Sequence, residues 1–114
     1  MNEFMMIFRN EKNDNPKPSP EQMQAMIKQW QDWIGGIAAQ DKFVATNALG
    51  FEGKTVNADA TITDGPYAEL KEIVGGYLIC KAESLNDAIK LVDGCPTLLI
   101  GGKVEVRDVM VFDM

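Results

Sequence analysis

Two short segments of this chain are apolar on both of their alternating sides. Residues 3–9, EFMMIFR, and residues 73–82, IVGGYLICKA, carry apolar side chains at odd and at even positions alike. Short apolar runs of this kind, bounded by polar residues, are typical of strands. A strand that is apolar on both sides is covered on both sides. Other parts of the structure, or a partner, must therefore cover both faces of the sheet that contains these two strands.

A helix is predicted over residues 19–39, between these strands. Ser19 suits the N-cap, Pro20 the first helical position, and Gln22 can complete a capping box. Apolar residues then recur every three or four positions and indicate one buried face: Met23, Met26, Ile27, Trp30, Trp33, Ile34 and Ile37. A core face is favoured over the alternative that its Met and Trp side chains line a ligand pocket. The glycines at 35 and 36 favour a kink or a close backbone contact there.

The rest of the chain supplies a second helix and further strands. A strand is predicted over residues 42–49, followed by a hairpin-like excursion that ends near residue 63. Gly75 and Gly76 indicate a bulge or the close approach of another backbone. Ser84 caps a second helix, which Gly94 and Pro96 are expected to end. The last predicted strand, residues 103–112, is half polar.

This order of elements predicts an α+β fold of the ferredoxin-like βαββαβ type, with both helices on one face of an antiparallel sheet. The helices then cover only one face, although two strands are apolar on both. The simplest cover for the other face is a second copy of the protein, so we expect a homodimer that packs sheet against sheet.

Length and charge limit the possible partners. The 114 residues form one expected domain, residues 1–114, with a net charge of −6 that would be repelled by nucleic acid or an anionic membrane. No apolar run approaches the roughly 20 residues that span a bilayer, and the first residues do not resemble a signal peptide. We therefore expect a cytoplasmic protein without a nucleic-acid or membrane partner.

The chain contains no histidine. An imidazole base, a histidine metal ligand and a Ser-His or Cys-His pair are all excluded. Cys80 and Cys95 lack a CxxC spacing and are expected to be packed, unreactive thiols. No phosphate-binding loop or metal-ligand spacing occurs, so neither a metal nor a cofactor is expected. Any acid or base must be Asp, Glu, Lys, Tyr or Cys.

The central segment TDGPYAELKE, residues 63–72, concentrates turn-forming and charged residues. Asp64 either opens a turn with Gly65 and Pro66 or faces a cleft as a general acid or base. Its charged neighbours form either a solvated surface or a site for a polar substrate: Glu69, Lys71 and Glu72. The phenols of Tyr67 and Tyr77 are potential donors, although core positions are commoner for tyrosine.

Glu105 and Arg107 share one side of the last predicted strand. They are either surface residues or face a wet cleft or a partner, where Arg107 would bind a carboxylate or phosphate.

The run DGPYAELKEIVGGYLI, residues 64–79, together with VEVRDV near the C-terminus, resembles the DGPF-domain branch of the YCII-related proteins. The likeness extends over nearly the whole chain, with Tyr67 in place of the usual Phe. It implies a dimeric α/β barrel of ferredoxin-like subunits with a cleft between the sheet and the segment after the turn. Some members of the wider family have a proposed catalytic His-Asp pair. Without a histidine, Asp64 would act without that partner.

Two functional hypotheses follow. In the first, the protein binds a small organic molecule in a cleft near the DGPY turn, as a cofactor-free lyase or isomerase with Asp64 as acid or base. Its expected substrate-binding residues are Arg107, Glu69, Glu72, Tyr67, Lys71 and Glu105. In the second, the protein is a non-catalytic homodimeric interaction or regulatory module, and the turn is only structural.

Overall fold

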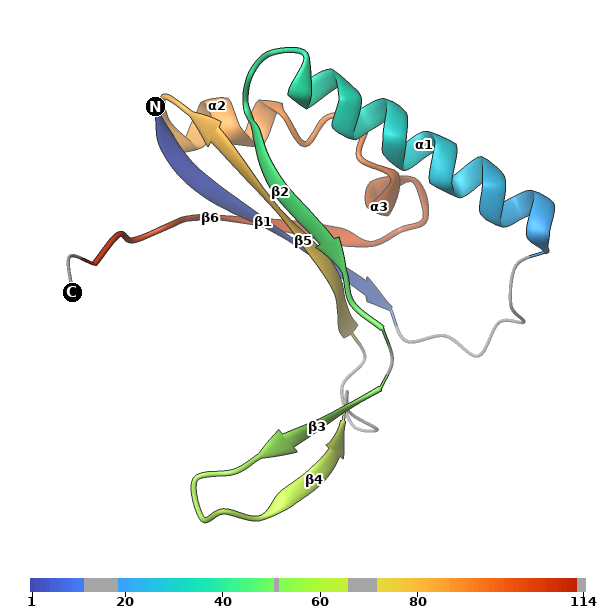
Figure 1. Cartoon of the computed structure of the whole chain (residues 1–114), viewed down its shortest axis with the longest axis vertical. Coiled ribbons are helices and arrows are strands. Elements are labelled where there is room, and N and C mark those ends of the chain that lie inside the picture. Colours follow the sequence, from blue (N-terminus) through green and yellow to red (C-terminus); the bar gives the residue numbers. More distant parts are fainter. Residues whose placement is uncertain (12–18, 51, 66–71, 113–114) are drawn as a thin grey trace.

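A computed structural model describes residues 1–11, 19–50, 52–65 and 72–112. Its main sheet has four antiparallel strands in the order β2-β5-β1-β6, which confirms the predicted ferredoxin-like arrangement (Figure 1). The elements along the chain are β1 (Asn2–Glu11), α1 (Pro20–Ala38), β2 (Phe43–Ala48), β3 (Gly53–Val56), β4 (Ile62–Gly65), β5 (Glu72–Ala82), α2 (Leu85–Lys90), α3 (Pro96–Leu99) and β6 (Lys103–Asp108).

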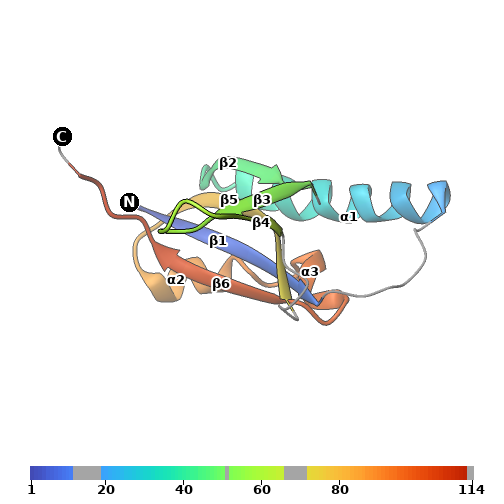
Figure 2. The ribbon, with the colours of Figure 1, turned by 90° about the horizontal axis from the view of Figure 1, so that it is seen from below.

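The three helices lie on one face of the sheet, which we call the helix face (Figure 1). Seen from below, after a turn of 90°, the strands pass in front of the helices where the two overlap (Figure 2). The central pair β1 and β5 supplies most of the core on the helix face: Phe4, Met6, Phe8, Leu78, Cys80 and Ala82. Met6 pairs with Leu78 in the register, and both side chains are fully buried. Burial of these side chains is the main force that holds the sheet against the helices.

The other side of the sheet, which we call the open face, carries Met5 and Ile7 of β1 and Tyr77 and Ile79 of β5. These four side chains are half-buried by one another and by their neighbours. The described helices lie on the other side of the sheet (Figures 1 and 2). The two-sided apolar pattern of β1 and β5 is therefore matched by a helix layer on one side only.

The predicted excursion is a hairpin of β3 and β4, whose strands pair with each other and not with the main sheet. It projects from the body on the side away from the helices (Figure 1). Val56 and Ile62 face each other in its register and are 71% and 61% exposed.

Helix α1 begins as its sequence predicts. The Ser19 hydroxyl accepts a hydrogen bond from the Gln22 backbone N–H at 3.1 Å, and the Gln22 side chain accepts one from the Ser19 N–H at 2.9 Å. The helix then runs as one element through Gly35 and Gly36. A Cβ built at either glycine has no described atom within 4 Å apart from the local helix backbone, so the predicted close contact there is wrong.

The Gly75–Gly76 pair does form both a bulge and a close approach, as expected. The pairing of β1 with β5 shifts from Phe8↔Gly76 to Arg9↔Val74, which leaves Gly75 without a cross-strand partner in β1. A Cβ on Gly76 would lie 2.7 Å from the Asn47 carbonyl oxygen of β2. Glycine is required at this position because the neighbouring backbone occupies the space of a side chain.

Two predicted boundaries differ from the structure. Pro96 was expected to end the second helix, but α2 ends at Lys90 and Pro96 begins the single turn α3, since proline fits the first helical position. The last strand ends at Asp108 and not at residue 112. Its ladder with β1 ends at the pair Phe4–Asp108, and Val109 N–H still donates to Glu3 O at 3.0 Å; because β1 begins at Asn2, a strand that reached residue 112 would extend past the start of its partner.

Candidate functional site

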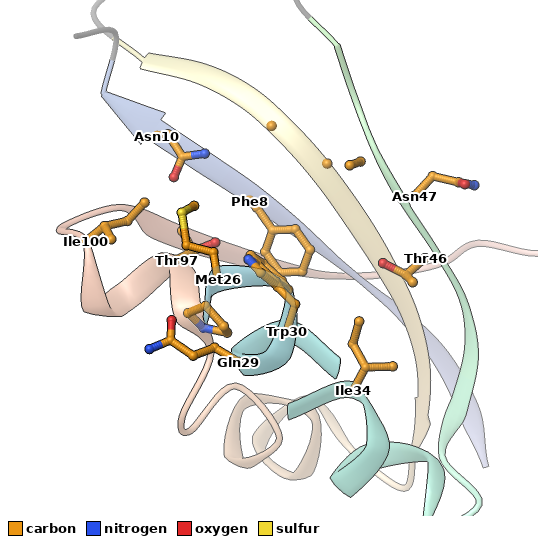
Figure 3. A pocket seen from close by; sticks show the side chains of 14 residues that line it. Phe8, Asn10, Met26, Gln29, Trp30, Ile34, Thr46, Asn47, Thr97 and Ile100 are labelled. Carbon is orange, nitrogen blue, oxygen red and sulfur yellow. The ribbon is translucent and has the colours of Figure 1, made fainter. Parts of the chain in front are cut away.

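A pocket of about 450 Å³ lies between α1, α3 and the end of the sheet at which β5 begins (Figure 3). It lies on the helix face. Strands β1, β2 and β5 form its floor, and α1 and the α3 segment form its walls. Ligand sites for small molecules usually have volumes of about 300–1,000 Å³, so this pocket has room for one.

The bulge in β5 helps to create this space. Gly75 and Gly76 both line the pocket and bring backbone to its surface without a side chain. Residues 46–48 of β2 continue the floor beside them, and the Thr46 hydroxyl is held by donation to Tyr77 O at 2.8 Å. The pair of glycines therefore fixes the strand spacing and leaves the floor open.

Aromatic rings form the wall between helix and strand. Phe8 lies 5.0 Å from Trp30 and 5.9 Å from Trp33, measured between ring centroids, and all three pairs of rings meet edge to face. The Trp33 Nε1–H donates to Leu91 O at 3.0 Å, which ties α1 to the end of α2. Phe8 and Trp30 line the pocket, so its apolar wall is also part of the packed core.

Asn10 is the most distinctive polar residue of the pocket. Its Oδ1 atom is buried and has no hydrogen-bond partner among the described residues. Its amide occupies space that side chains at two glycines would fill: a Cβ on Gly75 would lie 2.7 Å from Nδ2, and a Cβ on Gly102 would lie 2.9 Å from Oδ1. Buried amide oxygens normally have a donor, so this atom marks a place where a partner is expected.

None of the described lining residues is ionisable at neutral pH. The lining consists of apolar, amide and hydroxyl side chains with glycine and proline. The described part of the pocket can therefore bind and orient a molecule, but it offers no acid or base.

Glu105 and Arg107, two of the predicted site residues, lie together on the open face of β6. Glu105 lies between two guanidinium groups: Arg9 Nε is 3.3 Å from Oε1 and Arg107 Nε is 3.9 Å from Oε2. In the register, Arg107 pairs with Met5 and Glu105 with Ile7. Neither residue lines the pocket, which is on the other side of the sheet.

The remaining predicted site residues belong to the DGPY segment. Tyr67, Glu69 and Lys71 lie outside the described residues, as do the side chains of Asp64 and Glu72. The backbone of Asp64 is in β4, and that of Glu72 begins β5, three residues before the glycine pair. Along the chain, this segment therefore leads directly into the strand that forms the pocket floor.

The sequence favours a core face for the Met and Trp residues of α1, and the pocket confirms the less favoured alternative for Met26 and Trp30. Trp30 was assigned to a buried helix face, and Asn10 and Thr97 had no assigned role. Thr97 is almost fully buried in α3, an element that the sequence pattern did not predict. The glycine pair was the available signal, because it predicted a bulge or the close approach of another backbone, which is that of β2.

The two cysteines are buried and free, in agreement with the expectation of packed thiols. Burial raises the pKa of both the Cys80 and the Cys95 thiol, so each is held in its less reactive protonated form. Across the described residues, no three His, Cys, Asp or Glu side chains are grouped in a way that could hold a metal ion.

None of the described helices is long and apolar enough to cross a membrane.

Comparison with known proteins agrees with the resemblance seen in the motifs. A search of curated proteins gives no significant match. The family profile of the YCII-related domain, in contrast, matches residues 3–113, which is nearly the whole chain. The chain therefore belongs to the YCII-related family.

Proposed function

We propose that this protein binds a small organic molecule in the pocket between α1 and the sheet. The observation that carries the proposal is the pocket itself: about 450 Å³, with an aromatic wall and a buried amide oxygen that has no described partner. A largely apolar cavity with a few polar groups is the usual form of a small-molecule site.

Any reaction in this pocket needs an ionisable group that the described lining does not contain. Asp64 is our candidate for that acid or base, in a cofactor-free lyase or isomerase reaction, because its segment leads into β5 and the pocket floor. Glu69, Lys71 and Glu72 are further candidates for polar contacts from the same segment. Arg107 is a candidate anchor for an anionic group on the open face, where Glu105 is its neighbour.

A matched pair of variants on α1 tests binding in the pocket. Gln29 lines the pocket and Gln24 does not, although both are exposed residues of the same helix. A fragment that stabilises the protein in a thermal-shift screen is expected to bind at least about tenfold more weakly to Gln29→Phe, because the ring blocks the pocket. Gln24→Phe should bind it normally. Equal binding by both variants would place the fragment elsewhere.

The catalytic part of the proposal has its own test. Asp64→Asn keeps the size of the side chain but removes its proton-transfer capacity, so turnover of a converted ligand should fall by about a hundredfold or more while the ligand still binds. Unchanged turnover would remove Asp64 from the mechanism and leave the binding proposal intact.

The second candidate function is that of a homodimeric interaction module in the cytoplasm. The open face supports it, because Met5, Ile7, Tyr77 and Ile79 form an apolar surface that none of the described helices covers. A second copy would bury this surface. Sedimentation at micromolar concentration tests the dimer, and a stable monomer there would contradict it.

A further inference from the structure

We infer that the pocket accepts an uncharged aromatic molecule that donates a hydrogen bond to Asn10. The inference rests on the proposed function, since it names the chemical class of the ligand for the same pocket. Four observations carry it: the absence of charge in the described lining, the arrangement of the rings, the buried amide oxygen and the exposed apolar side chains of the lining.

The lining determines the charge of the ligand. A charged group that leaves water needs an opposite charge or several hydrogen bonds at its destination, and the described lining offers no ionisable side chain. The protein also has a net charge of −6, which adds a general repulsion of anions. Arg9 and Arg107, which could otherwise pair with an anionic ligand, lie on the open face and form ion pairs with Glu105. A neutral ligand is therefore favoured.

The rings and the backbone determine its shape. Phe8 and Trp30 are inclined by 67°, so a third ring can meet one of them edge to face and the other in an offset stack (Figure 3). Gly75 and Gly76 also line this space and add backbone without side chains to its surface, which leaves more room beside the rings. Met26 lines the same space, and its thioether packs favourably against aromatic rings.

Asn10 determines the polar group of the ligand. Its Oδ1 lacks a described donor, and the terminal torsion of asparagine is broad, so a modest rotation can present the oxygen to a ligand in the pocket. The Thr46 hydroxyl, by contrast, already donates to Tyr77 O. A hydroxyl or N–H group on the ligand would satisfy the Asn10 oxygen and gain a hydrogen bond in an apolar setting.

The exposed residues that line the pocket include apolar side chains, as expected for a site that binds an apolar ligand. Met26 on α1 and Ile100 after α3 both line the pocket and are 41% and 67% exposed. These side chains give an incoming apolar molecule a first contact before it reaches the interior rings.

Three naphthalene derivatives with one ring system test the inference: 1-naphthol, 1-methoxynaphthalene and 1-naphthoate. Binding is measured by calorimetry at pH 7, and the site is mapped by NMR shifts of the Gly75 and Gly76 amides and the Trp30 indole N–H. We expect 1-naphthol to bind at least about tenfold tighter than 1-naphthoate, because the carboxylate finds no countercharge. It should bind about fivefold tighter than 1-methoxynaphthalene, which has no donor.

A variant of Asn10 separates its role from general packing. Asn10→Leu removes the amide at similar size, so it should abolish the advantage of 1-naphthol over 1-methoxynaphthalene and raise the thermal midpoint of the free protein. Asn57→Leu is the matched control, because the Asn57 side chain donates to Thr61 at the end of the β3–β4 hairpin and does not line the pocket. It should keep the advantage of 1-naphthol.

The outcomes are distinguishable from failure of the proposed function. Tighter binding of 1-naphthoate at the pocket, or an advantage of 1-naphthol that persists in Asn10→Leu, would overturn the inferred ligand class and leave a ligand pocket. If none of the three compounds shifts these resonances while other fragments do, the inferred ligand class is again wrong, but the proposal that the pocket binds a small molecule is retained. If no fragment of any class shifts them, both proposals are wrong.

Discussion

Trp30 of α1 and Phe8 of β1 meet edge to face, with ring centroids 5.0 Å apart and ring planes inclined by 67°. This contact joins the long helix to the central strand and at the same time forms one wall of the pocket. The stability of the helix layer and the shape of the site therefore depend on the same pair of rings.

Replacing the ring of Trp30 should weaken the fold. Trp30→Leu retains helix propensity but loses the edge-to-face contacts with Phe8 and Trp33, so the free energy of unfolding should fall by about 2 kcal/mol. Urea unfolding followed by circular dichroism measures the change. A double-mutant cycle with Phe8→Leu should give a coupling of about 1 kcal/mol. Additive losses would show that the two rings do not stabilise each other.

Two glycines should respond oppositely to the same substitution. Gly35→Ala adds a methyl group in open space within α1 and should raise the free energy of unfolding by about 0.5–1 kcal/mol. Gly76→Ala places a Cβ 2.7 Å from Asn47 O, so β2 and β5 must separate, at a cost of about 2 kcal/mol. Thermal and urea unfolding of the pair compares them directly. Equal effects would contradict the close approach of these strands.

The turn of the β3–β4 hairpin should depend on pH through Asp59. Hydrogen bonds from the Thr61 hydroxyl, at 2.6 Å, and from the Thr61 N–H, at 3.0 Å, lower the pKa of Asp59 below its ordinary value of 3.8. Because the folded pKa is depressed, the contribution of Asp59 is present above pH 3.8 and is lost as the pH falls through the folded pKa. NMR titration should show the hairpin weakening only in that acidic range.

Thr61→Val removes the hydroxyl donor, so it should move the Asp59 midpoint upward toward 3.8. Thr63→Val, two residues further along in β4, is the control and should leave the midpoint in place. An Asp59 midpoint at or above 3.8 in the unmodified protein would be inconsistent with these hydrogen bonds.

Charge on the open face should prevent the proposed dimer. Ile79→Glu introduces a carboxylate beside Met5 in the cross-strand register, and its burial between two copies should raise the dimer dissociation constant by about thirtyfold or more. Met23→Glu makes the same charge change on an exposed position of α1 and should not affect association. Analytical ultracentrifugation distinguishes them, and dimers of equal strength would place the interface on another surface.

Much of the fold could be predicted from the sequence because its signals are local. Ser19 and Gln22 satisfy the helix start, the alternation of β1 places Phe4, Met6 and Phe8 on one face, and the glycine pair at 75 and 76 predicts a bulge. The end of β6 was missed because it depends on where its partner β1 begins. The turn α3 was missed because a proline can either end one helix or start the next.

The pocket was harder to predict for a related reason. Trp30 has the same helical spacing whether it only fills the core or also lines a cavity, and periodicity does not distinguish the two. Asn10 follows an apolar strand, and only the approach of Gly75 and Gly102 shows that its amide is buried. Arg107 and Glu105 were recognised as a pair in sequence, but the side of the sheet that they occupy relative to the pocket depends on the register of β6.

An NMR fragment screen with uniformly ¹⁵N-labelled protein tests the central claim most directly. The account predicts that the tightest-binding fragments shift the amides of Gly75, Gly76 and Thr97 together with the Trp30 indole N–H, all of which belong to residues that line the pocket. Shifts concentrated at Arg107 and Glu105 on the open face, with the pocket resonances unchanged, would contradict it.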